Sequence, residues 1–152
     1  MFFDIALTFD PETRRCDLVL GDDCDLVIDE TAVTPMLLSI GLDRRAAEDD
    51  PLPAGRDAFL VPTDFQVRRG WAGDALDRNG ERVGSRLWLL DRAKATEQTR
   101  MLFQMWLEEA LAWVKRETGK AAEIEVWWAA RELLRWRALI GNDEISQAVR
   151  FD

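Results

Sequence analysis

The feature that most constrains the fold is a stripe of apolar and small residues between positions 95 and 118. These residues recur at intervals of three and four, the spacing of one face of an α-helix. Gly119 follows, and glycine commonly ends a helix. We therefore expect one long amphipathic helix whose stripe is covered by the rest of the chain. The stripe consists of Thr99, Leu102, Phe103, Trp106, Ala110, Trp113 and Val114.

Strand-like alternation precedes this helix near the start of the chain. Apolar residues occupy every second position in residues 3–9, 16–20 and 24–29, and the turn-prone sequences DPET and GDD separate these segments. A period of two is typical of half-buried strands. The pattern predicts an N-terminal antiparallel meander with its apolar side chains facing the core: Phe3, Ile5, Leu7, Phe9, Leu18, Leu20, Leu26 and Ile28.

A short helix and a long irregular segment are expected next. Val33, Met36, Leu37 and Ile40 have helical spacing, with Thr34 as the expected N-cap and Pro35 at the first helical position. Between residues 46 and 84 the periodicity is lost, and glycine and proline interrupt the chain. An irregular segment of this length is more often functional than a passive connector.

The C-terminal part fits two patterns. Residues 131–140 contain good helix formers, yet Leu134, Trp136, Ala138 and Ile140 alternate as they do in a strand. The GND sequence that follows resembles a hairpin turn, so we favour antiparallel strands. The sequence as a whole predicts a single α+β domain over residues 1–152: meander, short helix, irregular middle segment, long amphipathic helix and C-terminal strands.

Composition narrows the function. The chain has no histidine and only two cysteines, which removes histidine-based catalysis and zinc ligation, and we expect neither cofactor nor metal. The net charge of −9 lies in residues 1–50, with 13 acids against 4 bases. This excess argues against nucleic acid contacting that part and is compatible with a basic protein partner. Neither end carries a long apolar run, so no signal peptide or membrane span is expected.

Two enzymatic or binding alternatives depend on aromatic residues beside charged ones. Asp74, Asp77 and Glu81 lie near tryptophans in the sequence and could form the acid pair of a peptidoglycan hydrolase. Three tryptophans interleaved with arginines in residues 127–137 could bind single-stranded nucleic acid. We favour structural roles for both groups, because a strand that alternates tryptophan with arginine commonly buries the former and exposes the latter.

The order of the middle motifs resembles a known family. "RGWAGD", residues 69–74, and "GSRLW", residues 84–88, followed by Lys94 and Thr96, are similar to the Mu-like phage baseplate proteins of contractile tails, which are related to small wedge subunits. The resemblance covers most of the chain. Related wedge subunits carry a Glu-Pro-Arg motif in this region, whereas Glu81 is here followed directly by Arg82.

This resemblance implies a non-enzymatic component of a phage or prophage tail baseplate, assembled in the bacterial host cytoplasm. Its expected partners are other wedge proteins and, beyond these, sheath or hub proteins, without nucleic acid, membrane or small-molecule substrate. Glycine and aspartate permit tight turns, while tryptophan and arginine dominate interfaces. The alternative is an internal clamp with its tryptophans against the long helix. The predicted partner-binding residues are Trp71, Gly73, Asp74, Glu81, Arg82, Arg86 and Trp88.

Overall fold

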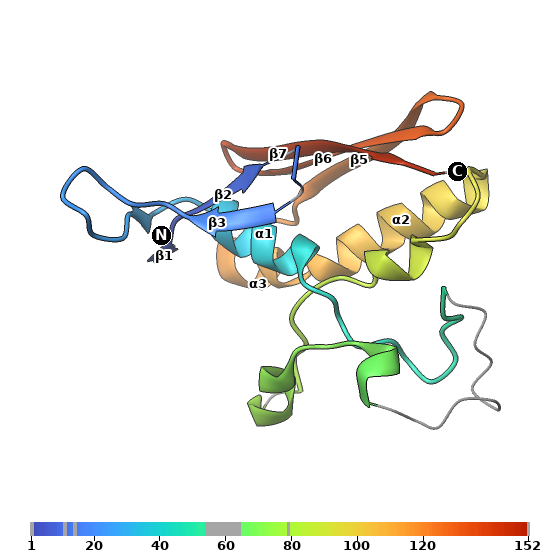
Figure 1. Ribbon diagram of the computed structural model, residues 1–152, viewed down its shortest axis with the longest axis horizontal. Coiled ribbons are helices and arrows are strands. Elements are labelled where there is room, and N and C mark those ends of the chain that lie inside the picture. Colours follow the sequence, from blue (N-terminus) through green and yellow to red (C-terminus); the bar gives the residue numbers. More distant parts are fainter. Residues whose placement is uncertain (1, 11, 14, 54–64, 79, 152) are drawn as a thin grey trace.

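The protein is an α+β structure in which an antiparallel sheet covers one side of a pair of helices. This computed structural model describes residues 2–10, 12–13, 15–53, 65–78 and 80–151. The sheet forms the upper layer in Figure 1, and α1 and α2 lie beneath it. The described parts of the middle segment lie below the helices in this view. The predicted fold class is therefore confirmed.

The C-terminal sheet consists of β5 (Glu123–Ala130), β6 (Leu133–Ile140) and β7 (Asp143–Arg150), in the order β5-β6-β7. The strand interpretation of residues 131–140 is confirmed over β6. Leu134, Trp136, Ala138 and Ile140 are all buried, as their alternation predicts. The strand pattern therefore outweighs the helix propensity of this segment.

The long amphipathic helix is interrupted, so the prediction of a single helix is wrong. It consists of α2 (Glu97–Ala110) and α3 (Trp113–Thr118). At the break, Ala112 N–H donates to Glu109 O and Val114 N–H donates to Leu111 O, which is the tighter i→i−3 pattern. Beyond this turn, Trp113 Nε1 donates to Ser39 Oγ at 2.9 Å. The break thus joins α3 to α1, while Gly119 ends α3 with φ of 78° as predicted.

Helix α1 (Val33–Gly41) begins earlier than the sequence suggested, and Thr34 is not its N-cap. Carboxylates from elsewhere take that role. Asp29 Oδ2 accepts from Thr34 N–H at 3.0 Å, and Asp143 Oδ2 accepts from Ala32 N–H at 2.8 Å. The Thr34 hydroxyl instead accepts from Leu7 N–H at 3.2 Å. Because Asp29 and Asp143 satisfy the N–H groups at the start of α1, the hydroxyl of Thr34 is available to bind a strand.

The N-terminal strands are antiparallel, as predicted, and form two pairs. The strands β1 (Asp4–Ile5) and β2 (Leu7–Asp10) follow each other, β2 pairs with β3 (Arg15–Leu18), and β1 pairs with β4 (Ile28–Asp29). Two backbone bonds lie between the two strand pairs: Ala6 N–H donates to Val27 O, and Val19 N–H donates to Ala6 O. These bonds join both pairs into one extended ribbon.

The predicted burial of this meander is largely wrong. Of the eight residues predicted to face the core, two pack against it, Leu7 and Phe9. Phe2, which lies in the opposite phase of the alternation, packs edge-on against Trp113 with ring centroids 5.8 Å apart. The ribbon extends beyond the edge of the helices, as the blue segment at the left of Figure 1 shows, so six of the eight alternating residues have no core to face. The exposed residues are Phe3, Ile5, Leu18, Leu20, Leu26 and Ile28.

The cap of α1 gives a test of stability against pH. Burial raises the pKa of Asp29, but hydrogen bonds from Thr31 and Thr34 outweigh it, so the pKa lies below its ordinary value of 3.8. We expect Asp29→Asn to lower the free energy of unfolding at pH 7 by about 1 kcal/mol, because an amide nitrogen replaces one of the two carboxylate oxygens that accept from Thr31 and Thr34. A lowered pKa stabilises the fold above the unfolded-state pKa and ceases to do so as the pH falls. The deficit should therefore shrink below about pH 4.

Urea unfolding of the wild type and the variant at pH 7 and pH 3 measures this difference. The control is Glu30→Gln, which removes an exposed neighbouring carboxylate and should change the free energy of unfolding by less than about 0.5 kcal/mol. An equal deficit of Asp29→Asn at both pH values would contradict the assigned role.

Candidate functional site

The middle segment lies against the end of α1 through its own backbone. Its regular parts are the short 3-10 helices η1 (Phe65–Arg68), η2 (Ala72–Leu76) and η3 (Leu87–Leu90). Between η2 and η3, Ser85 N–H donates to Leu42 O at 2.8 Å, and Arg44 N–H donates to Ser85 O at 2.9 Å. Gly84 makes this approach possible, because a Cβ on it would lie 2.4 Å from Leu42 O.

Four charged side chains fix the same part of the segment to α2. We call them the Arg86 cluster: Arg44, Asp50, Arg86 and Glu109. Arg86 donates from one guanidinium nitrogen to both oxygens of Asp50 at 3.0 Å, and its Nε donates to Glu109 at 2.9 Å. Arg44 pairs with the other oxygen of Glu109 at 3.2 Å. Two positive and two negative groups make the cluster neutral, which suits its partial burial.

The pKa of Arg86 shows the balance within the Arg86 cluster. Burial lowers the pKa of Arg86, but hydrogen bonds and charge attraction from Asp50 and Glu109 outweigh it and raise the pKa above its ordinary value. The guanidinium also lies over the Trp106 ring, 5.6 Å from its centroid. Arg86 therefore acts as a permanently charged internal tie between the middle segment and α2.

Trp88 also holds this segment to the rest of the chain. Its side chain is buried, and its Nε1 donates to Arg44 O at 2.8 Å. The Arg69 guanidinium covers the ring 4.5 Å from the centroid and pairs with Asp43 at 2.8 Å. The clamp alternative thus describes the contacts of Trp88 and Arg86 in the isolated chain.

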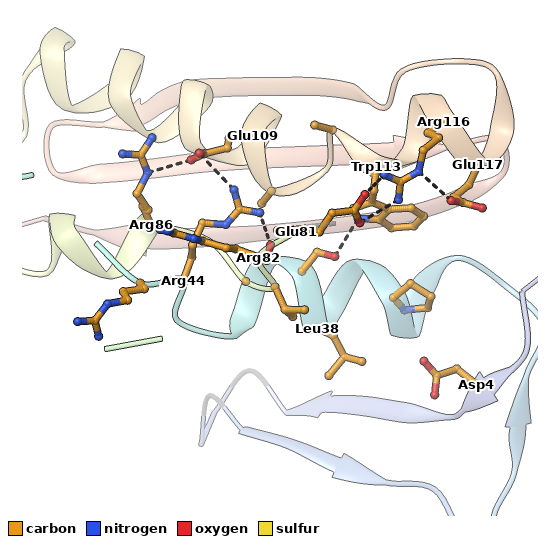
Figure 2. Close-up of a pocket in the computed structure, with 18 of the residues that line it drawn as sticks. Asp4, Leu38, Arg44, Glu81, Arg82, Arg86, Glu109, Trp113, Arg116 and Glu117 are labelled. Carbon is orange, nitrogen blue, oxygen red and sulfur yellow. Dashed lines mark hydrogen bonds and ion pairs between the residues drawn. The ribbon is translucent and has the colours of Figure 1, made fainter. Parts of the chain in front are cut away.

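An open pocket of about 860 Å³ lies between α1, the α2–α3 pair and residues 80–86. Figure 2 shows ion pairs on two sides of it: Glu109 with Arg44 and Arg86, and Glu81 with Arg116. Apolar contributions come from Leu38, Val83 and Trp113, among others. Its charged lining residues are Asp4, Arg44, Arg45, Glu81, Arg82, Arg86, Glu109, Arg116 and Glu117.

The pocket brings together three of the predicted partner-binding residues, Glu81, Arg82 and Arg86. Arg82 differs from the other two. Its carbonyl accepts from Arg44 at 2.6 Å, but its side chain is exposed. Within the described ranges, no carboxylate lies at ion-pair distance from its guanidinium.

The other predicted residues lie outside the pocket. Trp88 is buried in the clamp, whereas Trp71 is 53% exposed at the start of η2. The Trp71 ring lies over Gly73, where a Cβ would come within 2.3 Å of the ring. Asp74 Oδ1 accepts from Val83 N–H at 3.0 Å and closes this turn. Within the stretch of predicted partner-binding residues, Trp88 is therefore buried in the interior, whereas Trp71 lies in an exposed turn.

The acids of the hydrolase alternative have local structural contacts. Asp74 holds the turn at Val83, Asp77 accepts from Glu81 N–H at 2.5 Å, and Glu81 pairs with Arg116. Among the described residues, no group of three or more His, Cys, Asp or Glu is arranged to hold a metal ion. In the same part of the chain, no helix is both long and apolar enough to cross a membrane.

Two of the three tryptophans of the nucleic-acid alternative are used in packing, whereas Trp127 is 40% exposed. Trp136 is buried, and Trp128 packs edge-on against Phe151 with centroids 5.8 Å apart. Arg137 pairs across the sheet with Glu125 at 3.1 Å. These contacts follow the alternation expected of a strand with one buried face.

Asp50 and Glu109 are site residues that the sequence did not reveal. Asp50 lies 36 positions before Arg86, and Glu109 lies 23 positions after it. No local spacing connects them, because only the fold brings the three segments together. Glu109 has the appearance of an ordinary polar-face residue of an amphipathic helix.

The fold and this site define a small α+β protein in which an ion-paired, irregular segment builds a polar pocket. Residues 32–146 match the model of the family described as phage protein GP46, and the chain belongs to this family. The resemblance inferred from the sequence motifs is thereby confirmed.

Two relatives carry informative names. The chain is 39% identical over 109 residues to the baseplate protein gp46 of Escherichia phage Mu, covering 71% of this chain and 66% of that protein. It is 28% identical over 123 residues to the Mu-like prophage FluMu protein gp46 of Haemophilus influenzae, covering 81% and 73% respectively. The match thus spans slightly less than two thirds of the Mu protein. No solved structure matches the chain.

Gly84 provides a test of the close approach to α1. Both Gly80 and Gly84 have positive φ, at 72° and 93°, but nothing lies within 4 Å of a Cβ on Gly80. We expect Gly80→Ala to lower the free energy of unfolding by about 1 kcal/mol through backbone strain alone. Gly84→Ala should cost about 2 kcal/mol more, because its methyl group meets Leu42 O. Equal losses in urea unfolding would show that the approach is not tight.

Arg86 provides a test of the internal clamp. We expect Arg86→Ala to lower the free energy of unfolding by about 2 kcal/mol, because it leaves Asp50 and part of Glu109 without their cation in a half-buried site. For a chain of this size the melting temperature should fall by about 4–8 °C. The matched control is Arg116→Ala, whose ion pair with Glu81 is exposed and should contribute less than about 1 kcal/mol. Calorimetry that shows the same loss for both variants would refute the clamp.

Proposed function

We propose that this chain is a non-enzymatic wedge subunit of a contractile phage or prophage tail baseplate. Membership of the family and the similarity to a protein named as a Mu baseplate component support this role. In this role the chain resides in the tail baseplate of the virion, after assembly in the host cytoplasm. Its partners are other wedge proteins and the sheath or hub proteins that meet them.

The observation that carries the proposal is the exposed Arg82 guanidinium at the pocket. The neighbouring arginines Arg44, Arg86 and Arg116 are already paired with carboxylates of this chain. These pairs hold the wall of the pocket, whereas Arg82 has its donors directed to no described carboxylate. A guanidinium of this kind suits a carboxylate or carbonyl of an incoming protein segment.

Trp71 supplies a second contact point for the same partner. Its ring is half exposed yet held over the backbone of Gly73. An aromatic side chain that is already fixed loses little conformational entropy when a partner covers it. Arg82 and Trp71 are therefore the partner-binding residues that we place at the centre of the interface, with Glu81 and Asp74 holding the segment that carries them.

The test is size-exclusion chromatography with light scattering on this chain and the large wedge protein encoded beside it. The wild type should elute with that protein as one complex. Arg82→Ala and Trp71→Ala should each weaken the complex by about tenfold or more, as for interface hot spots, with unchanged melting temperatures. The matched control is Arg78→Ala, an exposed arginine of the same segment outside the pocket.

Binding by Arg82→Ala and Trp71→Ala at the wild-type affinity would remove the pocket from the interface. Separate elution of the wild type and the large wedge protein across salt and protein concentrations would count against the wedge role itself. Arg86→Ala separates stability from contact, because we expect its main effect to be on melting.

A further inference from the structure

The ribbon formed by residues 2–29 carries an apolar face that nothing described in the chain covers. Leu18, Leu20 and Ile28 are 51%, 67% and 54% exposed. The ribbon extends away from the helices and the sheet, at the left of Figure 1. Monomeric proteins rarely leave a contiguous set of large aliphatic side chains in water, so such a face usually marks a binding surface.

The strand register gathers these side chains on one face. Ile5 lies opposite Ile28, and Leu20 lies opposite Leu26, and residues opposite each other in an antiparallel pair project to the same side. Leu26 and Ile28 are two positions apart in extended chain, so the two pairs share that side. The result is a continuous aliphatic strip along the ribbon and not a set of scattered residues.

The charge of the ribbon restricts what can cover this strip. Residues 1–30 contain nine acids and two bases, a net −7 out of the −9 of the whole chain. A single β layer is about as thick as the screening length of about 8 Å at physiological ionic strength, so its acids still act, in attenuated form, on a partner at the opposite face. A second copy of the ribbon, an anionic lipid surface or a nucleic acid would all be repelled.

We propose that the aliphatic strip of the ribbon docks on a separate protein whose contact surface is apolar at its centre and basic at its rim. The proposal rests on the proposed function, since the partner is another protein of the tail. The surface is distinct from the pocket. It also lies before residue 32, where the family match begins, so the ribbon supplies a contact outside the matched part of the chain.

Biolayer interferometry against the purified complex of the other baseplate proteins encoded beside this chain tests the proposal. Leu20→Thr combined with Ile28→Thr keeps β-propensity while removing the aliphatic strip. It should weaken binding at least tenfold, because two large side chains lose their burial. The matched control is Met101→Gln with Met105→Gln, which removes two exposed apolar residues from α2. The control should bind as the wild type does, and circular dichroism should give equal melting temperatures for all three proteins.

Charge gives a second measurement. Asp22→Asn combined with Asp23→Asn removes two exposed acids at the tip of the ribbon. The association rate of the wild type should fall severalfold between 50 mM and 500 mM salt, and the variant should be slower at low salt with a shallower decline. An association rate independent of salt would overturn the assignment of a basic partner.

The outcomes separate this proposal from the proposed function. Wild-type affinity of the Leu20→Thr, Ile28→Thr variant, combined with weakened binding by Arg82→Ala, overturns the ribbon surface alone. No binding by the wild type overturns both. Concentration-dependent dimerisation in sedimentation experiments, abolished by the ribbon variant, would identify the occupant as a second copy and overturn the proposal of a basic partner.

Discussion

The bonds from Arg86 to Asp50 and Glu109 hold together the part of the molecule that lacks regular structure. In its described residues the middle segment has only short 3-10 helices, and few backbone hydrogen bonds, such as those of Ser85 with Leu42 and Arg44, fix its position. A bidentate contact to Asp50 and a further contact to Glu109 of α2 add to this constraint. These side-chain contacts and the backbone bonds of Ser85 together hold residues 80–86 across from α1, where the pocket lies.

The sequence predicted the helices and strands better than the contacts that these elements make with the rest of the chain. Periodicity of two identified β6 because Leu134 and Trp136 pack on one face, and Gly119 ended α3 as expected. The predictions of Thr34 as the cap of α1 and of an unbroken long helix were wrong, and the side chains that bind near these two points include Asp143 and Ser39, which lie far away in the sequence. The alternation of apolar residues in the ribbon predicted its strands correctly. It could not show whether the surface that covers these apolar side chains belongs to this chain or to another protein.

The sequence indicated the segment that contains the candidate site, but not which of its side chains are exposed and which are paired internally. Arginine and tryptophan suit both an interface and an internal tie, and Arg82 and Arg86 are only four positions apart. One is exposed and the other is held by two carboxylates. This difference comes from Asp50 and Glu109, which no local pattern links to the segment. The family resemblance depends on whole motifs and not on single contacts, so it identified the family without separating the roles of these two arginines.

The hydrogen bond from Ala32 to Asp143 joins groups 111 positions apart. Its consequence concerns the order of events during synthesis, in which a chain emerges from its N-terminus at a few residues per second. The N–H groups of Val33 and Thr34 in the first turn of α1 bind Thr31 and Asp29, which are made earlier, whereas the N–H of Ala32 has to wait for Asp143 at the start of β7. A product that ends before residue 143 therefore lacks this one bond at the start of α1, the helix that forms one wall of the pocket.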